Sequence, residues 1–115
     1  MYIHKSSFLI VITLLVCLSS NQISALENTE QYNIPYLEDA KVFAEFTNEL
    51  PAVVNYFTAH NEQEIVNFYQ EKFGKAISSE MKRGRLTLSF NHEDKKISVI
   101  VSQQGKKHQV DILLK

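Results

Sequence analysis

The sequence predicts an α+β domain in which one helix packs against one face of an antiparallel sheet. Three observations predict it: one stretch with apolar residues at helical spacing, several stretches that alternate apolar and polar residues, and turn-forming residues between them. A helix with one apolar stripe and a sheet with one apolar face can bury their apolar surfaces against each other. The expected order of elements along the chain is therefore β-β-α-β-β-β-β.

The first two strands are expected at residues 41–46 and 52–58. Alternation with a period of two places Val42, Ala44 and Phe46 on one face of the first strand. The second stretch, AVVNYFT, is rich in the β-branched and aromatic residues that favour strands. Residues 48–51 supply a turn, so we expect these two strands to pair with each other.

The helix is expected to begin after Asn61 and to end before Gly74. The Asn61 side chain can accept a hydrogen bond from the free backbone N–H groups, and Glu64 can reach back to complete a capping box. Glycine is the residue expected just past a helix C-terminus. The apolar side chains between these ends share one face of the helix; they are Ile65, Val66, Phe68, Tyr69 and Phe73.

A meander of four strands is expected after the helix, at residues 77–81, 86–90, 97–102 and 110–114. Turn-forming residues separate these strands at 82–85, 91–94 and 103–106. The side chains expected to face the helix are Leu86, Leu88, Phe90, Ile97, Val99, Val101, Val110, Ile112 and Leu114.

This run of motifs resembles a pattern found in small exported bacterial α+β domains. The resemblance is carried by Ala40-Lys41-Val42, by Phe57-Thr58 and by residues 61–69, NEQEIVNFY, followed by alternating strands. In those domains the helix opens with Ser-Pro, where this chain has Asn61-Glu62. The resemblance implies the same fold, and it carries over no catalytic residue.

The first 25 residues have the three parts of a secretory signal peptide. A start carrying Lys5 precedes an apolar run of eleven residues, FLIVITLLVCL, and small residues ending at Ala25. An uncleaved anchor is one alternative, but a helix needs roughly 17–25 apolar residues to cross a bilayer. Lipid attachment at Cys17 is another, although Leu15 and Val16 precede this cysteine where such signals carry small residues.

Cleavage after Ala25 leaves a flexible leader at 26–33 and a single domain at 34–115. Cys17 is the only cysteine in the chain, so the exported part folds without a disulfide. This combination favours the bacterial periplasm, or secretion. Two tyrosines near the leader, Tyr32 and Tyr36, receive no assignment from the sequence.

The charges divide the exported chain into an acidic and a basic half. Residues 26–74 hold two lysines against nine carboxylates, a net charge of −7, and residues 75–115 hold nine Lys and Arg against four carboxylates, a net charge of +5. Alternate turns of a meander lie at the same end of a sheet, so two basic turns are expected to cluster. This candidate anion- or partner-binding site comprises Lys82, Arg83, Arg85, Lys106 and Lys107. The alternative is that these cations keep hairpin tips soluble and discourage edge pairing.

No catalytic motif occurs in the sequence, and no cofactor or metal site is predicted. His92, beside Glu93 and Asp94, would be a weak metal ligand on a solvated turn, and His60 is expected at the surface. The expected function is a non-catalytic binding or interaction module for an envelope protein or an anionic envelope component, with no membrane span after processing. Nucleic acid is not an expected partner, because the compartment is wrong for it and the domain is not basic overall. A periplasmic inhibitor or immunity protein and a small enzyme with a site formed only on folding are the alternatives, and the oligomeric state stays open.

Overall fold

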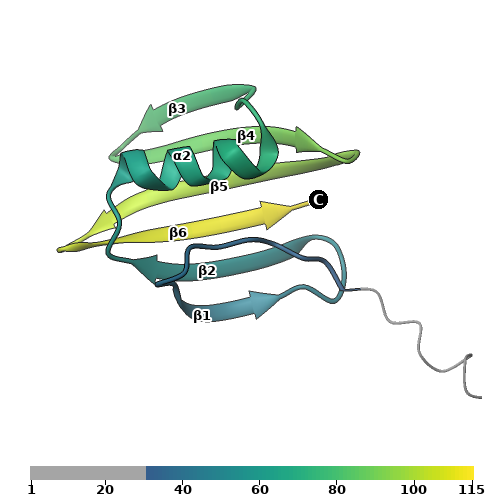
Figure 1. The fold of residues 1–115 in the computed structure, drawn as a ribbon, viewed down its shortest axis with the longest axis horizontal. Coiled ribbons are helices and arrows are strands. Elements are labelled where there is room, and N and C mark those ends of the chain that lie inside the picture. The colour runs from purple at the N-terminus through teal and green to yellow at the C-terminus, as the bar shows by residue number, and fades with distance from the viewer. Residues whose placement is uncertain (1–30) are drawn as a thin grey trace, which may run out of the picture. The chain divides into compact units, whose positions relative to one another are not determined.

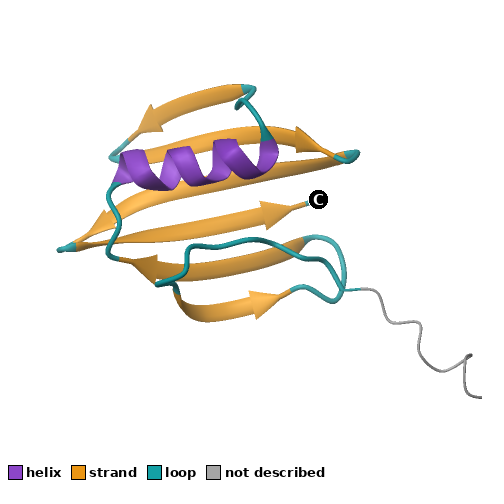
Figure 2. Cartoon of the chain, in the orientation of Figure 1, coloured by secondary structure: helices purple, strands orange, loops and turns teal. Residues whose placement is uncertain are grey.

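A computed structural model describes residues 31–115 of the chain. The predicted signal peptide and most of the predicted leader, residues 1–30, lie outside the described residues. The described part contains one helix and six strands in a single antiparallel sheet, in the order β-β-α-β-β-β-β (Figures 1 and 2). The predicted fold class is confirmed.

The strands lie in the sheet in the order β1-β2-β6-β5-β4-β3. After β2 the chain crosses through the helix to the opposite edge, and the meander then returns until β6 pairs with β2 (Figure 1). The last strand of the chain is therefore a central strand, bonded on both sides. The elements are β1 (Lys41–Phe46), β2 (Ala52–Thr58), α2 (Glu62–Phe73), β3 (Ser78–Lys82), β4 (Arg85–His92), β5 (Lys95–Gln104) and β6 (Lys107–Leu114).

The helix α2 begins and ends where its capping residues require. The Glu64 N–H donates to Asn61 Oδ1 at 2.8 Å, and the Asn61 N–H donates to Glu64 Oε1 at 2.9 Å, which completes the predicted capping box. At the other end, the Gly74 N–H donates to the carbonyl of Gln70 at 2.9 Å, with Gly74 at a φ of 92°. Glycine adopts this left-handed backbone without the steric cost of a Cβ.

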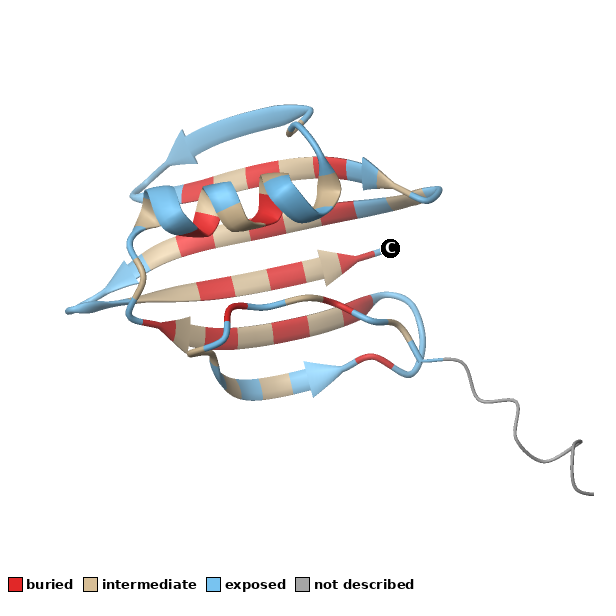
Figure 3. Cartoon of the chain, in the orientation of Figure 1, coloured by how far each residue is buried: buried red, intermediate tan, exposed pale blue. Residues whose placement is uncertain are grey.

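One face of the sheet is buried beneath the helix and the N-terminal segment. Residues on the strands alternate between buried and partly exposed, and Figure 3 shows this as alternating bands on β2, β4, β5 and β6. The nine residues predicted to face inward in the meander are all buried, none more than 9 % exposed. From the helix, Ile65 and Tyr69 are fully buried against this face.

The predicted alternation on the first strand is wrong from Ala44 onward. The register of β1 on β2 shifts between Val42 and Ala44, which marks a β-bulge. An extra residue in one strand reverses which face the following side chains occupy. Ala44 and Phe46 therefore lie beside Asn55 and Val53 on the outer face, instead of joining Val42 on the inner face, and Phe46 is 68 % exposed.

The N-terminal segment, residues 31–40, forms the second part of the layer that covers the sheet. Its Ile34 and Leu37 are buried in the core, and it runs across β2 and β6 beside the helix (Figure 1). The Tyr32 N–H donates to the carbonyl of Thr47 at 2.9 Å. Tyr32 lies in the part of the chain predicted to be a leader, and in the structure it is already attached to the domain.

A buried hydrogen-bonded pair joins this segment to the helix and the sheet. The hydroxyl groups of Tyr56 in β2 and Tyr69 in α2 lie 2.7 Å apart, and Tyr69 donates to the carbonyl of Pro35 at 3.0 Å. Because Tyr69 has one hydroxyl proton, Tyr56 is then the donor within the pair. Burial disfavours the phenolate and raises the pKa of Tyr56 to about 12, and burial raises the pKa of Tyr69 as well. Both hydroxyl groups therefore remain protonated donors at neutral pH.

The turn between β4 and β5 is predicted to be a place where one substitution stabilises the fold. Glu93 and Asp94 both have positive φ, 51° and 65°, in a two-residue hairpin turn that favours glycine at its second position. We expect Asp94→Gly to raise the free energy of unfolding by about 0.5–1 kcal/mol. Urea denaturation would show this as a higher midpoint with an unchanged m-value.

The matched control is the reverse change in the turn between β3 and β4. Gly84 occupies the equivalent second position, with a φ of 77°. Gly84→Asp is expected to lower the midpoint. A neutral or destabilising effect of Asp94→Gly would show that backbone strain does not limit this turn.

Candidate functional site

The structure brings the five predicted basic residues to one end of the sheet, where they stand on two separate turns. The β3–β4 and β5–β6 turns lie at the same end (Figure 1), and all five side chains are exposed. Strand β5 separates β4 from β6, so the two basic turns stand roughly 10 Å apart, two strand spacings. Within residues 31–115, none of the five forms an ion pair with a carboxylate.

A second polar cluster surrounds His60, just before the helix. His60 Nε2 lies 3.2 Å from Glu38 Oε1 and 3.8 Å from Asp39 Oδ1, and its Nδ1 lies 3.4 Å from Glu64 Oε1. Its carbonyl lies 3.0 Å from Nδ1 of His108 in β6. The sequence placed His60 at the surface; its side chain is 27 % exposed and lies among three carboxylates.

This cluster changes the ionisation of its members in opposite directions. Burial lowers the pKa of His60, but its hydrogen bond to Glu38 and the charges of Asp39 and Glu64 outweigh burial and raise the pKa above 6.5. Burial raises the pKa of Asp39, but hydrogen bonds from Thr58 and the next backbone N–H lower it below 3.8. The backbone N–H of the cap residue and the charge of His60 lower the pKa of Glu64 below 4.5. The cluster therefore favours a protonated histidine beside ionised carboxylates.

The histidine on the β4–β5 hairpin has an aromatic partner. The His92 ring lies 5.3 Å from the Phe73 ring, and its Nε2 lies 3.9 Å from Glu93 Oε2. In the part of the chain that the structure describes, no three His, Cys, Asp or Glu side chains are placed to hold a metal ion. His92 instead contributes to the wall of a cleft.

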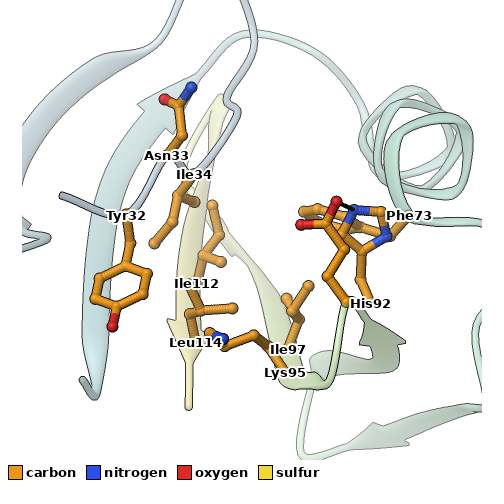
Figure 4. Close-up of a pocket in the computed structure, with 10 residues that line it drawn as sticks. Tyr32, Asn33, Ile34, Phe73, His92, Lys95, Ile97, Ile112 and Leu114 are labelled. Atoms are coloured by element: carbon orange, nitrogen blue, oxygen red, sulfur yellow. Dashed lines mark ion pairs between the residues drawn. The ribbon is translucent and has the colours of Figure 1, made fainter. Parts of the chain in front are cut away.

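The cleft lies between the N-terminal segment and the last turn of the helix, and it has a volume of about 280 Å³. Figure 4 shows Tyr32 and Ile34 on one side, and Phe73 with His92 on the other. Strands β5 and β6 provide the floor between these two walls, from the side chains of Ile97, Ile112 and Leu114.

The rim of the cleft is polar. Asn33, His92, Glu93 and Lys95 line it together with Tyr32. The Lys95 Nζ lies 5.9 Å from the centre of the Tyr32 ring, so the ammonium group faces the aromatic wall opposite its own strand. Lys95 is half-buried, while the Glu93 carboxylate at the turn is 83 % exposed.

Sequence reasoning did not find this cleft, because its residues come from four separate parts of the chain. Each has a separate local explanation: Phe73 belongs to the helix stripe, Ile97 and Ile112 to strand alternation, and His92 to a turn. The available signal was an aromatic residue with no structural assignment, and Tyr32 shared it with Tyr36, which does not line the cleft. The role of Tyr32 becomes visible only when the N-terminal segment is placed on the sheet.

Comparison with known proteins identifies no relative: no protein-family model, no curated protein and no solved structure matches the chain. The resemblance to small exported bacterial domains therefore stays a prediction. In residues 31–115, no helix has the length and apolar character needed to cross a bilayer.

The His60 cluster predicts how stability depends on pH. The raised pKa of His60 gives a contribution that is complete below pH 6.5 and is lost as the pH rises through the folded-state value. The lowered pKa values of Asp39 and Glu64 give contributions that are complete above their ordinary values, 3.8 and 4.5, and are lost as the pH falls. We expect the free energy of unfolding from this cluster to be greatest between pH 4.5 and 6.5. Urea denaturation across a pH series measures it.

His60→Gln separates this cluster from the rest of the protein. The variant should lose the decline in stability above pH 6.5. The control His92→Gln should keep the shape of the wild-type profile, because His92 has a single carboxylate contact, at 3.9 Å. An unchanged profile in His60→Gln would contradict the assignment.

Proposed function

We propose that the protein is a small exported, non-catalytic binding module that holds a small apolar ligand in the cleft. One observation carries the proposal: a cleft of about 280 Å³ lies between the walls made by Tyr32 and Phe73, over a floor of apolar side chains from β5 and β6 that are at most 9 % exposed. A ligand in the cleft would remove the remaining apolar surface of its walls and floor from water, which is favourable. The predicted signal peptide supports export, to the periplasm or to the medium.

The construction of the cleft also supports this function. Small-molecule sites are commonly concave, with an apolar lining and a few polar groups that fix the orientation of the ligand. Here the volume of about 280 Å³ is close to the lower limit of such sites, about 300 Å³. The polar groups lie at the rim, where they contact solvent and could form hydrogen bonds with the polar group of a ligand.

A periplasmic inhibitor or immunity protein is the second candidate, and a different surface favours it. The edge strand β1 exposes Phe43, at 49 %, and Phe46, at 68 %, on the outer face of the sheet. Exposed aromatic residues are enriched at protein interfaces. The basic turns lie at the end of the same sheet and would attract an anionic partner. This candidate needs a protein partner on the outer face, whereas the leading candidate uses the inner face.

Removing one wall of the cleft is expected to weaken ligand binding. The uncharged fluorescent probe N-phenyl-1-naphthylamine should bind the wild-type protein saturably, with one site per chain. Tyr32→Ala removes the aromatic wall beside the floor, and we expect it to weaken binding about 3- to 10-fold, as for the loss of one aromatic contact. A fluorescence titration measures this affinity.

Tyr36→Ala is the matched control, because it removes the same side chain four residues away in the same segment. Tyr36 packs against Tyr56, with ring centres 5.7 Å apart, and does not line the cleft. Probe affinity should stay unchanged in this variant. Absence of saturable binding, or equal losses in both variants, would count against the cleft as a binding site.

A further inference from the structure

We propose that the natural ligand of the cleft is a small amphipathic carboxylate, whose apolar body lies on the floor and whose charged group pairs with Lys95. This inference rests on the proposed function, because it names the class of ligand for the same site. It depends on the position of one cation at the rim, on the charges around it, and on the shape of the walls.

Lys95 is the cation that the cleft provides. It points from the inner face of β5, in the same register as Ile97, Val99 and Val101, and it is half-buried. Within residues 31–115 its ammonium group forms no ion pair with a carboxylate, and it lies 5.9 Å from the centre of the Tyr32 ring. A half-buried cation at the edge of an apolar floor is partly removed from water, which strengthens its attraction for an anion.

The other charged groups at the rim leave this attraction in place. The Glu93 carboxylate belongs to the turn, is 83 % exposed, and lies nearest to His92, at 3.9 Å. A ligand with a cationic group would meet Lys95 beside the Tyr32 ring, where like charges repel. A carboxylate instead meets an ammonium group that has no carboxylate partner within residues 31–115.

The C-terminal end of the helix disfavours an anion at the Phe73 side of the cleft. Phe73 is the last residue of α2, and the C-terminal end of a helix carries a partial negative charge of about −0.5. The carboxylate is therefore favoured at the Lys95 end, and the apolar body at the Phe73 end. There the body would pack between the Phe73 ring and the side chains of Ile97 and Ile112 (Figure 4).

The experiment compares two probes that differ only in their charged group. Binding of 4-phenylbutanoate and of 4-phenylbutan-1-ol is measured by two-dimensional NMR titration of the ¹⁵N-labelled protein, which also locates the bound probe. The acid is expected to bind about fivefold more tightly than the alcohol. Lys95→Gln should remove this preference by weakening the acid alone, and added salt should weaken the acid and spare the alcohol.

Lys96→Gln is the matched control, since Lys96 is the next residue of the same strand. It is exposed, and it pairs with Asn91 on the outer face of the sheet. The acid should keep its full affinity in this variant. Octanoate and octanol, compared in the same way, show whether the body must be aromatic.

The results test two claims separately: that the cleft binds a ligand, and that this ligand is a carboxylate that pairs with Lys95. Equal affinities for acid and alcohol at the cleft, unchanged in Lys95→Gln, would overturn the carboxylate class and leave the binding site in place. Shift changes located outside the cleft, or no saturable binding of either probe, would overturn both. A preference for the acid lost equally in Lys95→Gln and Lys96→Gln would reflect net charge and would overturn the role of Lys95.

Discussion

The hydroxyl group of Tyr69 is the point at which three parts of the domain are joined. It bonds at 2.7 Å to the hydroxyl group of Tyr56 in β2 and at 3.0 Å to the carbonyl of Pro35 in the N-terminal segment. Both tyrosine side chains are fully buried. Buried polar groups that lose their partners are costly, so each of these groups restricts the positions of the other two. The segment, the helix and the sheet are held in one arrangement by this constraint.

That constraint matters because one helix is too narrow to cover the sheet. A helix with its side chains is about 10 Å wide, which covers about two strands at a spacing of about 4.8 Å. The six-stranded sheet therefore has a larger inner face than α2 can bury. The N-terminal segment covers β2 and β6, while the inner side of β3 stays open, with Met81 at 59 % exposure. The cleft is the space left between the two coverings, over apolar residues of β5 and β6.

Much of the fold could be predicted from the sequence because its signals are local. Asn61, Glu64 and Gly74 define the helix by contacts within a few residues, and the alternation of residues 86–90, 97–102 and 110–114 is regular. The failure at Phe46 has an equally local cause, because a bulge leaves no mark in a short alternating pattern. The site was harder to predict. Tyr32, Phe73 and Lys95 are distant in sequence, and only the return of β6 to the centre of the sheet brings them together.

The basic turns were also predicted only in part: their position on the sheet was predicted, but the direction of their side chains was not. Counting turns in the meander predicts correctly that Arg83 and Lys106 lie at one end of the sheet. It does not predict that both side chains are directed to solvent and not into a common pocket. The predicted meander therefore locates charges along the sheet, while a binding site also requires the direction of each side chain and the covering layer.

Hydrogen exchange in Tyr69→Phe tests most directly whether the tyrosine pair holds the N-terminal segment in place. The substitution removes a hydroxyl group, so that Tyr56 and the carbonyl of Pro35 each lose a hydrogen-bond partner, at a cost of about 1–3 kcal/mol. If the lost free energy destabilises mainly the N-terminal segment, its amides should exchange about 10- to 100-fold faster. The amides to follow are those of Tyr32 and Ala40, which donate to the carbonyls of Thr47 and Leu37. The amide of Val99, in the centre of the sheet, should change much less. Equal acceleration at Tyr32 and Val99, or none at either, would contradict this account.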